Sequence, residues 1–206
     1  MLLIEELEKL KSVLLHMAKY TKDVIYKTSS LFEKLESSYR ERIWSEIDNS
    51  ASLLERIRKE FVNEVLVFIA RRQPLGKELL VAHTLIGIAY DVYRISRYCR
   101  EIARIDSMLN PASSLSDVED IKGVFSEAVK AVEISLNDLI SLEPINEATV
   151  IEIDNKVDEY YKKLLKEVVL RDSVDRLTAL KILIMRHIER IVDHANYIEN
   201  YLKTLA

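Results

Sequence analysis

The scarcity of turn-forming residues constrains this chain more than any other feature of its sequence. Only three glycines and three prolines occur among its 206 residues, while hydrophobic residues make up 49% of them. Leu, Ile, Glu, Lys and Ala are abundant, as they are in helical proteins. A few long helices joined by short loops are therefore expected, and the predicted fold class is all-α.

The spacing of the apolar residues locates these helices. Apolar residues recur at intervals of three, four and seven positions, which is typical of a helix with one buried face. Proline and glycine interrupt the pattern at residues 73–76, Gln-Pro-Leu-Gly, since proline disfavours helix in the residue before it. The pattern predicts six helices, over residues 4–34, 38–72, 77–109, 118–142, 147–170 and 174–205.

A polar stretch of small residues divides the six helices into two sets of three. Residues 110–117 read Asn-Pro-Ala-Ser-Ser-Leu-Ser-Asp, the longest such stretch in the chain. Segments of this composition are typical of loops between packed units. The predicted units are residues 1–110 and residues 117–206, each a three-helix bundle.

The two halves also share short sequence matches. Residues 46–49 and 152–155 both read Glu-Ile-Asp-Asn, in the second and fifth predicted helices. Residues 93–98 of the third helix align with residues 189–194 of the sixth, and an Arg-Ile pair occupies the same place in both. These matches predict an internal repeat, with the halves related by a pseudo-twofold axis.

Composition excludes several classes of partner. The net charge of -4 is spread over 34 acidic and 30 basic residues without long blocks of one sign, so no nucleic-acid partner is expected. The lone Cys99 cannot form an internal disulfide, which suits a reducing cytoplasm. No uninterrupted apolar run approaches the roughly 20 residues that span a bilayer, so no direct membrane insertion is expected.

Surface grooves between helices leave room for a homodimer.

Four carboxylates form the candidate site. Glu189 and Asp193 lie four residues apart and share one face of the last helix, roughly 6 Å apart along its axis. Asp154 and Asp158 have the same spacing on the fifth helix. Since Glu189 and Asp193 lie nearly opposite the apolar stripe of their helix, we expect them on the surface of the bundle or in a surface groove. If the two helices are antiparallel neighbours, the four carboxylates converge and form a candidate metal site.

Several alternatives stand beside a metal site. Oxygen-rich sites suit hard or borderline metals such as Mg, Ca, Mn or Fe. Acidic pairs of this spacing are also common on solvated helices, and Arg186 and Arg190 can satisfy the carboxylates from within the same helix. His187 and His194 fall at the edge of the apolar stripe, where packing is favoured over metal ligation. No phosphate-binding glycine loop, nucleophile elbow or Cys/His metal spacing occurs, so the chain is not expected to be an enzyme.

At these residues the chain resembles a known family. Residues 69–79, 88–95 and 102–103 resemble the first half of PhoU proteins, the phosphate-uptake regulators. Residues 154–158, Asp-Asn-Lys-Val-Asp, and residues 186–195, Arg-His-Ile-Glu-Arg-Ile-Val-Asp-His-Ala, resemble the second half more closely. The resemblance covers essentially the full length of the chain.

The resemblance implies both a fold and a role. The fold is a tandem pair of three-helix bundles, and the role is that of a cytoplasmic, non-catalytic regulator that restrains phosphate uptake. The implied partners are the ATPase of a phosphate ABC transporter, or a signalling protein, at the membrane. Some members bind iron or zinc through these acidic motifs, and by match the ligands here are Asp154, Asp158, Glu189 and Asp193.

The first half departs from the family pattern. Ser52, Tyr93 and Arg97 stand where the family has acidic residues, and only Asp48 is retained. No metal cluster is therefore expected in this half. Our hypothesis is that Arg97 takes the place of the cation and pairs with Asp48.

In the second half, Tyr197 and Glu199 also differ from the family pattern, which argues against a full multinuclear cluster there.

Two other functions stay open. The divergence of the first half leaves room for a regulator of another transporter or channel with the same fold. A helical di-metal carboxylate enzyme is less favoured, because it requires inward-facing Glu-x-x-His pairs that neither acidic pair here provides.

Overall fold

Six long helices make up the described part of the protein. The computed structural model describes residues 2–109, 115 and 118–205. Within these residues no strand occurs, and the helices are α1 (Leu2–Ser30), α2 (Ser37–Arg72), α3 (Lys77–Ser107), α4 (Glu119–Ser141), α5 (Glu147–Val169) and α6 (Arg176–Leu205). The predicted all-α class and the six helices are confirmed, with helix ends that differ from prediction by a few residues. Apart from residue 115, the predicted boundary at 110–117 lies outside the described residues, so the division there stays a prediction.

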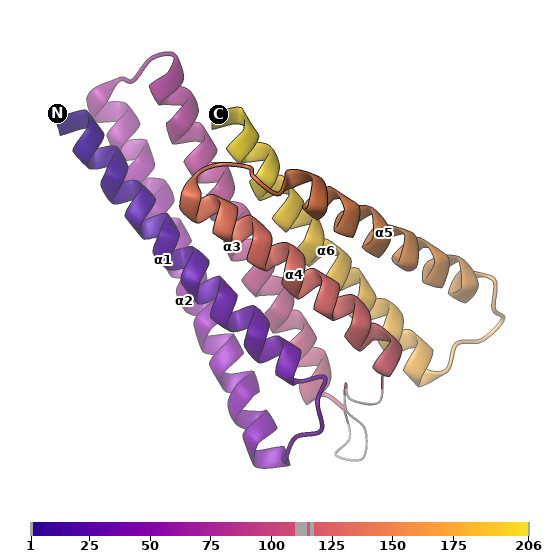
Figure 1. Ribbon diagram of the computed structural model, residues 1–206. Coiled ribbons are helices and arrows are strands. Elements are labelled where there is room, and N and C mark those ends of the chain that lie inside the picture. The colour runs from indigo at the N-terminus through magenta and orange to yellow at the C-terminus, as the bar shows by residue number, and fades with distance from the viewer. Residues whose placement is uncertain (1, 110–114, 116–117, 206) are drawn as a thin grey trace.

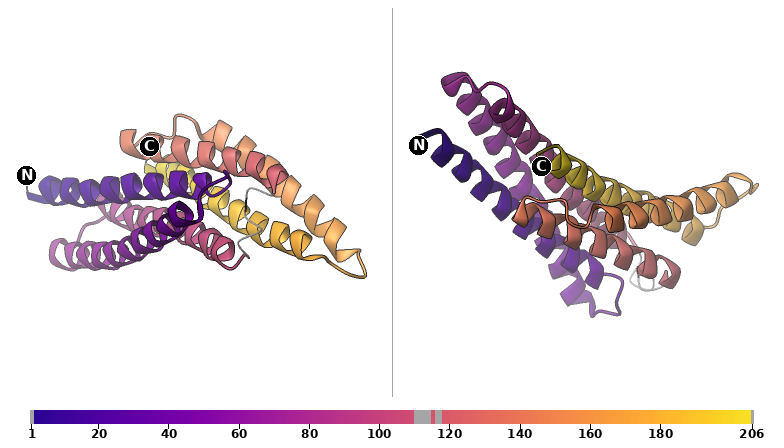
Figure 2. Two further views of the ribbon diagram at one scale, coloured as in Figure 1. Left: turned by 90° about the horizontal axis from the view of Figure 1, so that it is seen from below. Right: turned by 45° about the horizontal axis from the view of Figure 1, so that its top comes forward.

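The helices pack as two sets of three. In the first half α1, α2 and α3 contact one another, and in the second half α4, α5 and α6 do the same. The halves meet where α3 contacts α6 and where α1 contacts α4 (Figure 1). The loop that joins α5 to α6 extends to the end of the molecule farthest from the N-terminus (Figure 2).

The helices α3 and α6 form the centre of this arrangement. Each contacts three other helices, so apolar residues are needed on several of its faces. The fully buried side chains include Ile88 and Ile95 of α3 and Ile184 and Ile191 of α6, and one continuous core runs through both halves. A Cβ atom at Gly87 would lie 2.3 Å from Cζ of Tyr201, so glycine here lets the two helices approach closely.

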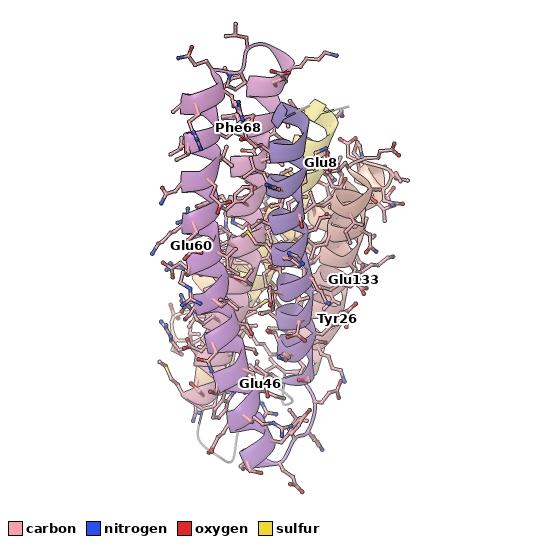
Figure 3. The ribbon with its side chains drawn as sticks, turned by 90° about the vertical axis from the view of Figure 1, so that its left-hand side faces the viewer. Glu8, Tyr26, Glu46, Glu60, Phe68 and Glu133 are labelled. Atoms are coloured by element: carbon pink, nitrogen blue, oxygen red, sulfur yellow. The ribbon has the colours of Figure 1, made fainter. Side chains whose placement is uncertain are left out.

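The outer face of the first half is formed by α1 and α2 (Figure 3). Phe68 is buried near the end of α2, where Leu10 of α1 lines the same shallow groove. Lys27 of α1 forms an ion pair with Glu46 of α2 at 3.1 Å. No helix in the described ranges has an apolar segment long enough to cross a membrane.

A buried ion pair ties the ends of three helices together. Asp106, near the end of α3, accepts hydrogen bonds from Arg40 at 2.7 Å and from the Trp44 indole at 2.8 Å, both on α2. Arg40 also donates to the carbonyl oxygens of Leu31 and Glu33, which follow α1. Each buried charge therefore has several partners, which limits the cost of removing it from water.

Glu199 of α6 is the least compensated buried charge. Its side chain is fully buried, and neither carboxylate oxygen has a hydrogen-bond partner among the described residues. The hydroxyl of the neighbouring Ser135 donates to the carbonyl oxygen of Ala195 at 2.9 Å. Burial, together with the negative charge of Asp138, raises the pKa of Glu199 from 4.5 to about 7.

This carboxyl makes stability depend on pH. Its pKa is higher in the folded protein than in the unfolded chain, so its contribution to the free energy of unfolding is largest below pH 4.5 and is lost as the pH rises to about 7. The loss is about 3 kcal/mol. We expect Glu199→Gln to raise the free energy of unfolding at pH 8 and to leave it nearly unchanged at pH 4.5, as measured by urea denaturation. Parallel pH profiles for the two proteins would contradict this assignment.

Candidate functional site

The four predicted site residues lie on the facing helices α5 and α6. These helices are connected by a short loop, run in opposite directions and contact each other (Figure 1). Asp154 and Asp158 occupy successive turns of α5, and Glu189 and Asp193 occupy successive turns of α6. The structure thus provides the antiparallel arrangement on which convergence of the four carboxylates depends.

Two arginines of α6 neutralise the two α6 carboxylates. Arg186 donates to both oxygens of Glu189 at 2.9 Å. Arg190 lies 3.1 Å from the second oxygen of Glu189 and 2.6 Å from Asp193, so one guanidinium bridges both acids. This confirms the alternative in which arginines of the same helix satisfy the carboxylates.

The α5 carboxylates have uncharged or exposed partners. The side-chain amide of Asn196 on α6 donates to Asp154 at 2.9 Å, which links the two helices directly. Asp158 pairs with Lys162, one turn further along α5, at 2.5 Å. Asn196 was not predicted, although its position three residues after Asp193 places it on the same face of α6.

The pKa values of the carboxyl groups show that they influence one another. Burial is the largest cause that raises the pKa of Asp154, Glu189 and Asp193. The negative charge of Asp158 adds to the increase in all three, while Arg186 and Arg190 oppose it for Glu189 and Asp193. The structure therefore forms an acidic cluster, defined here as Asp154, Asp158, Glu189 and Asp193.

The acidic cluster is more buried than the sequence predicts. The side chain of Glu189 is only 8% exposed and that of Asp193 only 18% exposed. The expectation that both lie on the surface of the bundle or in a surface groove is wrong for Glu189, which is buried where α6 contacts α5 as well as α3. Hydrophobic periodicity identifies one buried face of a helix but does not identify a second face covered by another neighbour.

The arrangement does not form a ready metal-ligand set. In the part of the chain that the structure describes, no three Asp, Glu, His or Cys side chains are grouped so that they could hold a metal ion. The contacts explain this, since Arg190 occupies the space between Glu189 and Asp193. A metal ion bridging these two acids would have to displace the guanidinium group.

The two histidines point to the other side of α6, as predicted. His194 is buried at the contact with α3, where its Nδ1 atom lies 2.7 Å from the carboxylate of Asp91. Its ring stacks on Tyr98 with 5.7 Å between centroids, and Tyr98 also packs against His187 at 5.8 Å. The carboxyl group of Asp91 was not predicted as a partner of His194.

These contacts confirm the register of the internal repeat. In the alignment of residues 93–98 with residues 189–194, Tyr98 corresponds to His194 and Asp91 corresponds to His187. Tyr98 stacks on its own counterpart, and the contact of Asp91 with His194 is matched by the contact of His187 with Tyr98. Such reciprocal pairing is expected where a twofold axis passes between two helices.

The counterpart of the acidic cluster in the first half has a different composition. The repeat places Asp48, Ser52, Tyr93 and Arg97 at the positions of the four acids. Arg97 and Asp48 form no ion pair in the described structure, so that hypothesis is wrong. The hydroxyl of Tyr93 lies beside the guanidinium of Arg97 and raises its pKa, and Asp48 instead lines a hollow with Arg100.

Comparisons with known proteins find similarity to PhoU proteins. A family model described as the PhoU domain matches residues 14–105. A PhoU homolog of Synechocystis, named a phosphate-specific transport system accessory protein, is 24% identical over 70% of this chain and 66% of its own length. A similarly named PhoU homolog 2 of Thermotoga maritima is 25% identical over 96% of this chain and 84% of its own length.

The fold extends the similarity over both halves. The crystal structure of PhoU from Pseudomonas aeruginosa superposes with a TM-score of 0.79 at 20% identity, covering 98% of this chain and 97% of that one. The domain match lies in the first half, whereas the Thermotoga similarity and the superposition include the second half and its acidic cluster. Residues 14–105 thus match the PhoU domain, and nearly the whole chain is similar to PhoU proteins in sequence and in fold.

Proposed function

We propose that this protein is an accessory regulator of phosphate uptake that acts by binding other proteins and catalyses no reaction. The observation that carries the proposal is the similarity, over 96% of the chain, to a protein named for the phosphate-specific transport system. The proposed partners are the ATPase of a phosphate ABC transporter or its signalling partner, and the proposed location is the cytoplasm.

The contacts within the acidic cluster support a non-catalytic role. A helical di-metal enzyme needs carboxylates and histidines that converge on one open position. Here Glu189 and Asp193 are held by Arg186 and Arg190, and His194 faces α3. A regulator of another transporter or channel is the second candidate, because Ser52, Tyr93 and Arg97 replace acidic residues of the family pattern.

Metal binding at the acidic cluster is a separate proposal. We propose that iron or zinc, or else Mg, Mn or Ca, binds there only in competition with Arg190. The support is the position of its guanidinium, which contacts Glu189 and Asp193 at 3.1 and 2.6 Å. Metal occupancy would then depend on a side chain of the same helix as well as on the supply of metal.

The regulatory proposal is tested by phosphate uptake in cells that lack the gene. In phosphate-replete medium we expect deletion to raise uptake of labelled phosphate, and a plasmid copy of the chain to restore the lower rate. Affinity purification of the tagged chain is expected to recover a phosphate transporter ATPase or its signalling partner. Unchanged uptake together with recovery of a different transporter would favour the second candidate.

The metal proposal is tested by removing the competing guanidinium. We expect Arg190→Gln to bind Zn²⁺ or Fe²⁺ at least about tenfold more tightly than the unmodified protein, since charge-assisted bonds to two carboxylates no longer compete. Isothermal titration with elemental analysis measures this. In the control, the further changes Asp158→Asn and Asp193→Asn should abolish the gain. Equal affinities for the unmodified protein and Arg190→Gln would contradict competition.

A further inference from the structure

Three arginines gather at the contact between α2 and α3, where the first half replaces the acidic cluster. Arg97 and Arg100 lie on successive turns of α3, and Arg58 of α2 lies over the ring of Tyr93 at 5.3 Å. Within the described residues, none of the three has a carboxylate oxygen within 4.0 Å. We call Arg58, Arg97 and Arg100 the arginine cluster.

The acids closest to the arginine cluster are engaged elsewhere. Glu55 is near enough for Arg100 and Arg97 to contribute to its lowered pKa, but the largest cause is its hydrogen bond with Lys59, at 2.9 Å. Glu101 pairs with Arg104 at 3.2 Å. Of the acid positions in the repeat, only the exposed Asp48 is retained here. Positive charge at this contact therefore exceeds the negative charge that could balance it.

Neutral groups hold the guanidinium groups in place. Arg100 donates to the hydroxyl of Ser52 at 3.3 Å, and the hydroxyl of Tyr93 lies beside Arg97. The Nε atoms of Arg58 and Arg100 are inaccessible to solvent and have no hydrogen-bond partner among the described residues. An inaccessible donor without an acceptor is costly, so the hydrogen-bonding capacity of Arg58 and Arg100 is only partly used within the chain.

A hollow of about 260 Å³ adjoins the arginine cluster. It lies between α2 and α3, and Arg100 is the member of the arginine cluster that lines it. Arg104, the carboxylate-bearing Asp48 and the small polar residues Ser45 and Ser107 also line it. The volume is several times the roughly 30 Å³ that one water molecule occupies in the liquid, so a tetrahedral oxyanion fits. Guanidinium groups match the geometry of phosphate oxygens, and serine hydroxyls can add further donors.

We propose that the arginine cluster and the adjoining hollow form a binding site for a phosphate group, either inorganic phosphate or a phosphomonoester. At the corresponding positions the second half holds four carboxylates, of which Glu189 and Asp193 pair with arginines, whereas the arginines of the first half have no carboxylate partner within 4.0 Å among the described residues. The site occupies the place in the repeat where the other half keeps its carboxylates. Binding requires no transporter, so its test is independent of the role in phosphate uptake.

Isothermal titration of the full chain tests the site with three ligands at constant ionic strength: inorganic phosphate, phenyl phosphate and chloride. We expect saturable binding of inorganic phosphate, phenyl phosphate or both, and none of chloride. The double variant Arg97→Gln/Arg100→Gln should weaken phosphate binding about tenfold or more, because each guanidinium contributes charge-assisted hydrogen bonds. Preference between the two phosphates identifies the source of the group.

The matched control is Arg71→Gln/Arg171→Gln, which removes the same charge at two exposed positions outside the cluster. It should bind phosphate like the unmodified protein. A second variant, Arg97→Lys/Arg100→Lys, keeps the charge but loses the forked donors and should show intermediate affinity. Circular dichroism checks that all variants fold. Absence of saturable phosphate binding, or equal weakening in the control, would overturn the proposal.

Discussion

Neither half of this protein can cover its own third helix, and that constraint shapes the rest of the molecule. The helices α3 and α6 carry apolar residues on several faces, so each needs a neighbour beyond the two helices of its own half. Each of these two helices covers apolar residues of the other, and their contact is so close that Gly87 lies opposite Tyr201.

The reciprocal contacts of α3 and α6 fix the correspondence between two sites that differ in charge. Because Tyr98 stacks on His194, the positions beside them on each helix are matched in space as well as in sequence. The second half keeps four carboxylates and neutralises Glu189 and Asp193 with arginines of the same helix. The first half has only Asp48 as an acid at the four corresponding positions, and Arg58, Arg97 and Arg100 form no ion pair with the residues that the structure describes. Corresponding positions of the two halves thus carry different charges.

The sequence predicts the helices and the repeat well because both depend on local patterns. Apolar periodicity and the rarity of glycine and proline are sufficient to locate six helices, and the match of residues 93–98 with residues 189–194 gives the register that the contacts of α3 with α6 follow. The sequence also places the four acids on helices that contact each other, α5 and α6. It fails where a second helix determines the environment: Glu189 is buried by tertiary packing, and Asp91 meets His194 across the two halves.

The Arg97 hypothesis failed for a related reason. Charge complementarity in a sequence suggests a partner for Arg97, but the side-chain positions on α2 and α3 decide which groups meet. Tyr93 lies one turn before Arg97 on α3 and supplies a hydroxyl beside its guanidinium, while Asp48 faces the hollow near Arg100. The consequence is a first half with more free positive charge than the sequence alone indicates.

The divergence of charge between the halves is tested most directly by nuclear magnetic resonance of the ¹⁵N-labelled protein during titration with inorganic phosphate. We expect the largest amide shifts around Ser52, Arg97 and Arg100, with no comparable shifts around Asp158 and Asp193. Shifts centred on the second half, or spread evenly over exposed basic residues of both halves, would contradict the claim that the repeat has produced an anion site in one half only.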